Sequence, residues 1–157
     1  MAKVIPSIQR GHEKSHLRGM WFNEDIDLEA LNRFNTGMSA QLGIKITGMD
    51  EEGMEAIMPV DERTCQPFGI LHGGATAALA ETVGSFASFL TIDPDKYRTL
   101  GMEVHAQHLR SVSSGQVHAR AEPIHMGRQV QVWSIRVTDD DARLVAICKL
   151  NVMVVPA

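Results

Sequence analysis

Hydrophobic and polar residues change their spacing along the chain, and each spacing predicts a different element. Between residues 27 and 37, Leu28, Leu31 and Phe34 recur at three-residue steps and Gly37 follows, which predicts a short amphipathic helix. The spacing then becomes two on both sides of a turn at residues 50–53, so we expect a two-stranded hairpin. The alternating apolar residues of this hairpin are Ile44, Ile46, Met54, Ala56 and Met58.

A long apolar segment comes next, from about Gly74 to Leu90, and it ends before the sequence DPD. Apolar residues occur nearly all around this predicted helix, and many of them are alanine, so we expect other elements to pack closely against it. One acidic residue, Glu81, lies in its middle with no basic residue nearby in the sequence.

The second half of the chain predicts four strands, within residues 99–110, 115–127, 128–141 and 142–155. In the first of these, Met102, Val104 and Ala106 share one face. All six strands together could form one antiparallel sheet that wraps the long helix, which is an α+β arrangement, and oligomerisation is one way to cover its edges and outer face. In the third strand one face carries Val130, Val132, Ser134 and Arg136, and the other carries Gln131, Trp133, Ile135 and Val137.

Length and composition predict one soluble domain over residues 21–157, preceded by a polar, partly disordered extension over residues 1–20. The net charge of -4 argues against a nucleic-acid partner, although it leaves room for a local cationic site. No segment has the length or pattern of a membrane span or signal peptide, and Cys65 and Cys148 lack metal spacing, so we expect a cytoplasmic protein. His12 and His16 could meet on a helix, but a metal site there is not expected.

Glu81 is the first candidate for chemistry, because a carboxylate in an apolar helix is unfavourable unless it is paired or reactive. Burial would raise its pKa and strengthen it as a base or nucleophile. Ser85 lies one turn later on the same face. The alternative is structural, with Glu81 paired to an arginine elsewhere in the fold.

His72, Gly73 and Gly74 are the second candidate, because they begin the predicted helix. The first turn of a helix presents unpaired N–H groups and the positive end of the dipole, which would polarise a carbonyl oxygen. Gly73 and Glu81 are eight residues apart, about 12 Å along one helix. If both act on one carbon atom, two copies of the helix must meet, which predicts a site shared within a dimer. The alternative is that the glycines only permit a tight start of the helix.

The stretch QPFGILHGGATAALAETVGS resembles the motif at the helix start of hotdog-fold acyl-CoA thioesterases. The likeness is strongest to the branch with glutamate-type 4-hydroxybenzoyl-CoA thioesterase and 1,4-dihydroxy-2-naphthoyl-CoA thioesterase, and it extends over about residues 27–155. It implies one long helix wrapped by a six-stranded antiparallel sheet. The motif Q-P-F-G-x-L-H-G-G, with an acid eight residues after Gly73, the first glycine of the final pair, is specific.

The resemblance also implies roles for individual residues. Glu81 matches the catalytic carboxylate, Gly73 the residue whose N–H polarises the thioester carbonyl, and Ser85 a residue that places water. Gln66 and His72 match the polar pair that orients the thioester. Family sites lie across a dimer interface, and two dimers usually form a tetramer. Residues near the coenzyme A tail would be His108, Arg110, Ser111, Gly127 and Arg128.

The expected reaction is therefore hydrolysis of an acyl-CoA or aroyl-CoA thioester to the free acid and CoA, without a metal or other cofactor. One alternative is a hotdog hydratase or dehydratase, which uses histidine as the base. Here the acid Glu81 is on the helix and His72 is at the glycine turn, which disfavours that chemistry. Another alternative is a non-catalytic acyl-CoA-binding protein. An acyl pocket for aromatic or medium-length aliphatic groups is expected near Phe86, Phe89, Met38, Leu71 and Met102.

Overall fold

The structure, a computed structural model, describes residues 19–23 and 26–157. The predicted extension lies outside the described residues except for Gly19 and Met20, and the pair His12 and His16 lies outside them entirely. The elements are α1 (Leu28–Phe34), α2 (Met38–Gln41), β1 (Lys45–Met49), β2 (Met54–Pro59), α3 (Gly73–Leu90), β3 (Tyr97–His108), β4 (Gln116–Met126), β5 (Val130–Asp139) and β6 (Leu144–Pro156).

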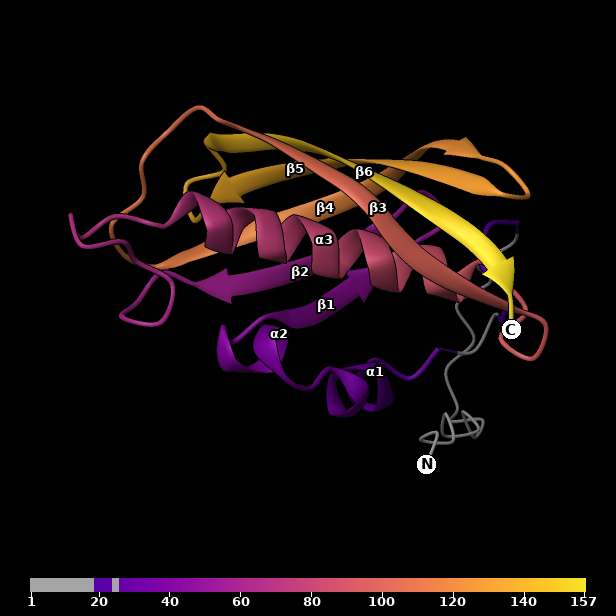
Figure 1. Cartoon of the computed structure of the whole chain (residues 1–157). Helices are drawn as coiled ribbons and strands as arrows, with labels where there is room; N and C mark the ends of the chain where they lie inside the picture. Colours follow the sequence, from indigo (N-terminus) through magenta and orange to yellow (C-terminus); the bar gives the residue numbers. More distant parts are fainter. Residues whose placement is uncertain (1–18, 24–25) are drawn as a thin grey trace.

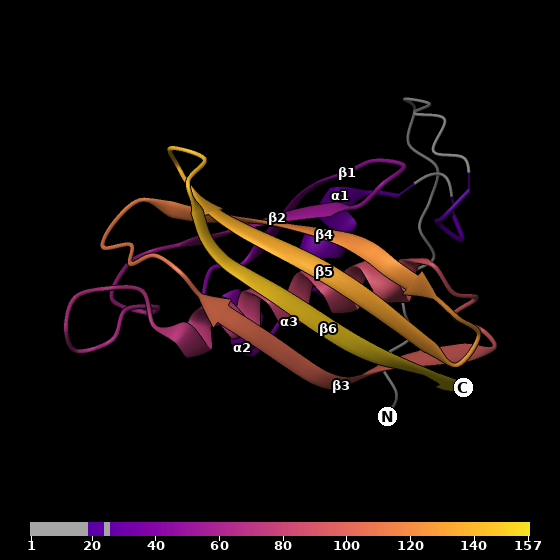
Figure 2. The same ribbon diagram turned by 90° about the horizontal axis from the view of Figure 1, so that it is seen from above.

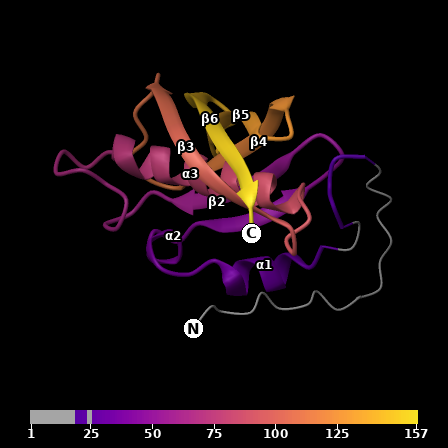
Figure 3. The ribbon, with the colours of Figure 1, turned by 45° about the vertical axis from the view of Figure 1, so that its right-hand side comes forward.

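The six strands form one antiparallel sheet in the order β1-β2-β4-β5-β6-β3. The sheet curves around α3, which lies along its concave face, while α1 and α2 lie beside β1 and α3 (Figures 1 and 3). The predicted α+β arrangement of one long helix wrapped by a six-stranded sheet is confirmed.

The core lies between the inner face of the sheet and α3. On β5, the predicted alternation separates two faces, and the one with Gln131, Trp133, Ile135 and Val137 is buried. Small residues on α3 let the sheet approach closely: a Cβ atom added to Gly84 would lie 2.6 Å from Cδ2 of Leu150. At Gly84 the helix therefore packs directly against β6.

Strand β3 is an edge strand, since it pairs only with β6 among the described strands (Figure 2). A β-bulge between Gly101 and Glu103 interrupts its register. The prediction that Met102 shares a face with Val104 and Ala106 is wrong for this reason: both of those residues are half-buried, whereas Met102 is 53% exposed. A bulge inserts one residue and so reverses the alternation beyond it.

The short helix α2 was not predicted, and Gly37 serves as its N-cap at φ 71° instead of ending α1. Helix α1 ends two residues earlier, where Asn35 is the C-cap. The buried Asn35 side chain donates a hydrogen bond from Nδ2 to the carbonyl oxygen of Ile44, 2.8 Å away. This long-range contact draws the chain out of the helix before Gly37. None of the helices in the described ranges has the length and hydropathy that crossing a membrane requires.

Candidate active site

The loop between β2 and α3 fixes where α3 begins. Its anchor is Thr64, a buried residue whose Oγ1 donates to the carbonyl oxygen of Pro59 (2.7 Å) and accepts from the N–H of Asp61 (3.0 Å). The N–H of His72 donates to the carbonyl oxygen of Thr64 (2.9 Å). The start of α3 is therefore tied to the end of β2.

A tight turn carries Gln66 beside this start. Cys65 and Leu71 form a bridge at its base, the N–H of Gln66 donates to the carbonyl oxygen of Ile70 (2.8 Å), and Gly69 adopts φ 75°. Gln66 is half-buried. Phe68, at the tip, is 87% exposed.

His72 is the N-cap of α3, and its Nδ1 accepts a hydrogen bond from the N–H of Gly74 at 2.8 Å. A ring nitrogen that accepts cannot carry a proton, so this geometry assigns the neutral tautomer with the proton on Nε2. The N–H of Gly73 donates to no acceptor among the described residues. An unpaired donor therefore remains at the positive end of the helix.

His108, the last residue of β3, lies against the same helix start. A Cβ atom added to Gly73 would be only 2.9 Å from its Nε2. Glycine at position 73 thus lets the end of β3 approach the first turn of α3. The structure therefore places His108 beside Gly73, whose N–H is predicted to polarise the thioester carbonyl. A contact between His108 and coenzyme A stays a prediction.

Glu81 is half-buried on α3, and its Oε1 accepts one long hydrogen bond from Oγ of Ser85, at 3.4 Å. Burial raises the pKa of the Glu81 carboxyl group, and the Ser85 hydroxyl partly offsets that rise. Within the described ranges Glu81 makes no ion pair, so the structural alternative of an arginine partner has no support there.

The Glu81 carboxyl group also lies against Gly101 of β3. A Cβ atom added to Gly101 would be 2.1 Å from Oε1 of Glu81. Sequence reasoning missed Gly101. The available signal was a glycine inside an alternating strand pattern, which often marks a bulge or a close approach.

One copy of the chain does not bring all the predicted residues together. Gly73 and Glu81 lie on one continuous helix, eight residues or about 12 Å apart along its axis. Arg110 and Ser111 are exposed just after β3, near the start of α3. Either the reacting groups act separately or a second copy completes the site.

Gly127 and Arg128 lie near the C-terminal end of α3, whereas His108 lies against its start. They form the turn between β4 and β5, where the N–H of Gly127 donates to the carbonyl oxygen of Val130 (2.9 Å). With Thr91, just beyond α3, they line a pocket of about 580 Å³. The two groups of predicted coenzyme A contacts are therefore separated within one copy.

The remaining candidate groups add little chemistry. Burial raises the pKa of the Cys148 thiol to about 11, so the thiolate form is scarce at neutral pH. No group of three or more histidine, cysteine, aspartate or glutamate residues in the described part of the chain could hold a metal ion. Of the predicted acyl-pocket residues, Leu71 belongs to the core, Met38 and Met102 are exposed, and Phe86 contacts Phe34 edge to face at 6.4 Å.

Comparison with known proteins identifies the family. The sequence profile of the thioesterase superfamily matches residues 68–146. The proofreading thioesterase EntH of Cronobacter turicensis is 46% identical over 136 residues, which are 86% of this chain and 98% of that protein.

Solved structures agree. A mutant of thioesterase PA1618 from Pseudomonas aeruginosa superposes with a TM-score of 0.86 at 45% identity, covering 88% of this chain and 100% of that one. Thioesterase HI1161 from Haemophilus influenzae gives a TM-score of 0.84 at 42% identity, covering 88% and 96%. The fold is the hotdog fold, and the chain belongs to the thioesterase superfamily.

Proposed function

We propose that this protein hydrolyses an acyl-CoA or aroyl-CoA thioester to the free carboxylic acid and CoA, with Glu81 as the catalytic carboxylate. The observation that carries the proposal is Glu81 itself: a half-buried carboxylate on an apolar helix, with a raised pKa and no cation paired to it among the described residues. Such a group is unfavourable for folding and well suited to bind a proton or attack carbon.

In the proposed reaction the thioester carbonyl oxygen accepts a hydrogen bond from the N–H of Gly73. Glu81 then acts in one of two ways. As a nucleophile it attacks the carbonyl carbon, the C–S bond breaks with departure of CoA thiolate, and water hydrolyses the resulting anhydride. As a general base it removes a proton from water, the hydroxide attacks the carbonyl carbon, and the C–S bond breaks with departure of CoA thiolate. Ser85 would help to place that water, and negative charge on the carbonyl oxygen is stabilised at the helix start.

The site is proposed to be shared between two copies of the chain. Within one copy, Gly73 and Glu81 are too far apart along α3 to act on one carbon atom. Strand β3, which carries Gly101 beside Glu81, leaves one edge without a partner strand among the described residues. Pairing of two copies at this edge would place two α3 helices side by side, and two such dimers would make the tetramer.

The substrate class is proposed to include aryl thioesters. The relative from Cronobacter turicensis is named a proofreading thioesterase, and this name specifies no acyl group. Membership in the branch with 4-hydroxybenzoyl-CoA and dihydroxynaphthoyl-CoA thioesterases therefore stays a prediction. Phe86, five residues after Glu81 on α3, contacts Phe34 of α1 edge to face. Cys65 and Cys148 are free thiols, which fits the proposed cytoplasmic location.

The test is release of free thiol from benzoyl-CoA, hydroxybenzoyl-CoA, dihydroxynaphthoyl-CoA and C4 to C16 acyl-CoA esters. We expect turnover with at least one aryl ester. Hydration of crotonyl-CoA without thiol release would instead support the hydratase alternative, and binding of esters without any turnover would support a binding protein. Either result would contradict the proposal that this protein hydrolyses thioesters.

Subunit mixing tests the shared site. The Gly73→Pro variant removes the N–H in question and adds a Cβ that displaces the His108 ring, so it inactivates this half of the site, and proline is tolerated at the first position of a helix. His72 has φ -73° and ψ 130°, which a following proline allows. Gly73→Pro and Glu81→Gln chains should each be inactive alone, whereas co-expression should restore about a quarter of the activity, from one intact site in half of the dimers. If mixed dimers recover no thioesterase activity, the Gly73 N–H and Glu81 must act within one chain.

A further inference from the structure

Gly101 occupies a special place on β3. It pairs with Val152, whose side chain is buried, so position 101 faces the inside of the sheet. The bulge begins at this residue. Glu81 on α3 reaches toward the same point from the other side.

The backbone does not demand glycine at position 101. Among the described residues, glycines with positive φ are Gly19, Gly37, Gly43, Gly69 and Gly115, so Gly101 has a conformation that other residues adopt. Glycine also weakens the interior of a strand, because it adds flexibility and has no side chain to pack. The reason for a glycine here must therefore be space.

The space at Gly101 is filled by one group. The three heavy atoms nearest to an added Cβ all belong to the carboxyl group of Glu81: Oε1 at 2.1 Å, Cδ at 3.1 Å and Oε2 at 3.5 Å. An atom cannot lie 2.1 Å from a carboxylate oxygen without displacing it. Any side chain at position 101 would therefore move the carboxyl group.

The hydrogen bond from Ser85 cannot hold this carboxyl group alone. At 3.4 Å it is long, and it constrains only Oε1. The backbone of β3 at Gly101 supplies a second contact, from an element whose position is fixed by pairing with β6. Two contacts from different elements restrict the side chain more than one does.

We propose that Gly101 is a positioning residue for the reaction: its missing side chain lets the Glu81 carboxylate rest against β3, which sets the direction in which the carboxylate acts. This inference rests on the proposed function of Glu81. Gly101 would act only through the Glu81 carboxyl group, against which it lies.

The test is the Gly101→Ala variant, assayed with the best thioester of the substrate panel. We expect kcat to fall on the order of 10²-fold, because a displacement of about 1 Å has this effect in active sites, with little change in KM. Gly48→Ala is the matched control. Gly48 also lies at a bulge in a strand, and its added Cβ would meet Oε2 of a glutamate, Glu55, at 3.3 Å, but on β1 away from α3. Its kcat should stay at the wild-type value.

A double-mutant cycle separates positioning from a general loss of structure. In Glu81→Asp the carboxylate is drawn back by one methylene group, away from position 101. If Gly101 positions the carboxylate, the double variant Gly101→Ala with Glu81→Asp loses less kcat than the product of the two single losses. Losses that multiply would overturn the proposal, and so would wild-type kcat in Gly101→Ala or an equal loss in Gly48→Ala.

The cycle also covers a Gly101→Ala chain that fails to fold. Adding Glu81→Ala removes the group in conflict, so recovered folding of this second double variant supports the contact, whereas failure of both overturns it. The proposed function is judged separately. Wild-type kcat in Glu81→Gln would contradict the proposed hydrolase mechanism. An inactive Glu81→Gln variant together with wild-type kcat in Gly101→Ala would contradict only the proposed role of Gly101.

Discussion

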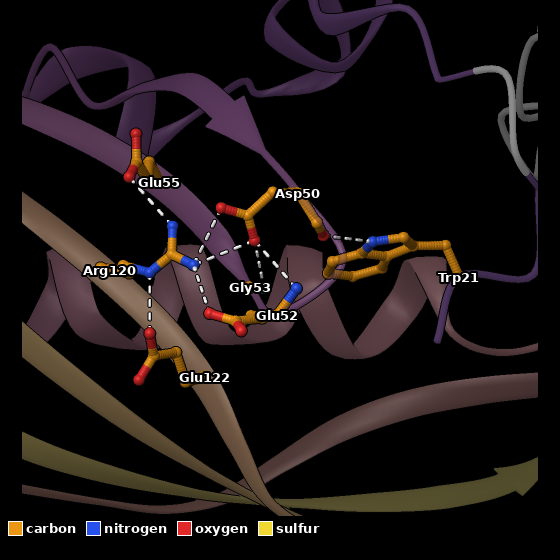
Figure 4. Close-up of polar contacts among 7 residues, drawn as sticks. All are labelled: Trp21, Asp50, Glu52, Gly53, Glu55, Arg120 and Glu122. Atoms are coloured by element: carbon orange, nitrogen blue, oxygen red, sulfur yellow. Dashed lines mark hydrogen bonds and ion pairs between the residues drawn. The ribbon is translucent and has the colours of Figure 1, made fainter. Parts of the chain in front are cut away.

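Two groups of carboxylates in this molecule have opposite surroundings. On the outer side of the sheet, Arg120 of β4 is surrounded by acids (Figure 4). Its Nε contacts Glu122 at 2.8 Å, its Nη1 contacts Glu55 at 3.0 Å and its Nη2 contacts Asp50 at 2.9 Å. On α3, Glu81 has a serine hydroxyl at 3.4 Å and no ion pair among the described residues.

The pKa shifts follow from this difference. Hydrogen bonding to Arg120 is the largest cause that lowers the pKa of the Asp50 carboxyl group, and the surrounding acids raise the pKa of Arg120. For Glu81, loss of water contacts raises the pKa. A carboxylate with a cation partner stabilises the hairpin between β1 and β2, where Trp21 also donates from Nε1 to the carbonyl oxygen of Asp50. A carboxylate without one is left free for chemistry.

The largest expected effect is on turnover in the Glu81→Gln variant. The amide keeps the shape of the side chain but can neither take a proton from water nor attack a carbonyl carbon. We expect kcat to fall on the order of 10³-fold or more, with a far smaller change in KM. Glu122→Gln is the matched control, because it makes the same change beside Arg120 and should leave kcat unchanged. Equal losses of kcat in Glu81→Gln and Glu122→Gln would show that the unpaired carboxylate on α3 is no more important for turnover than the paired carboxylates around Arg120.

The Ser85→Ala variant should have a smaller effect on the same group. A hydrogen bond to a charged group contributes about 1.5 kcal/mol, so its loss should lower kcat roughly ten-fold. The Ser85 hydroxyl lowers the pKa of Glu81, so its removal should raise that pKa further. In a pH-rate profile, the decline of kcat toward acid should therefore begin at a higher pH than in the wild type. A profile that stays in place would show that Ser85 does not interact with the reacting carboxylate.

The Arg120→Gln variant should affect stability and not turnover. It leaves four acids, Asp50, Glu52, Glu55 and Glu122, near one another without their cation. We expect the free energy of unfolding to fall by about 1–2 kcal/mol at neutral pH. The sign of its pH dependence follows from Asp50: its pKa is lowered in the fold, so the stabilisation is present above the unfolded value of 3.8 and is lost as pH falls through the folded value. Urea unfolding at several pH values would measure it. A kcat loss in this variant would contradict a purely structural role.

The smallest effect is on stability at Glu81. Its pKa is raised in the fold, so the folded state favours the protonated form, and charging it lowers stability as pH rises from about the ordinary glutamate value of 4.5 through the folded value. The Glu81→Gln variant should therefore unfold at higher urea than wild type at neutral pH, by less than about 1 kcal/mol because the group is partly exposed. This difference should vanish in acid. The difference between Arg120→Gln and wild type should also shrink in acid, but it has the opposite sign, because that variant is the less stable one at neutral pH.

The hydrophobic pattern determined most of the architecture. Period-two alternation on β5 predicted its two faces, and the apolar segment after the glycine pair predicted α3. Such patterns are local, because burial of one face requires only the right spacing. The motif around Glu81 by itself also indicated the thioesterase family.

Tertiary structure alone decided the rest. Asn35 ends α1 through a contact with Ile44, the bulge at Gly101 turns Met102 outward, and the predicted coenzyme A contacts Arg110 and Arg128 lie near opposite ends of α3. Each of these depends on residues that are distant in the sequence. A sequence shows that Glu81 is acidic and in an apolar helix. Whether a cation reaches it, and which strand its carboxyl group rests against, depends on which elements the fold packs beside it, and no local spacing encodes that.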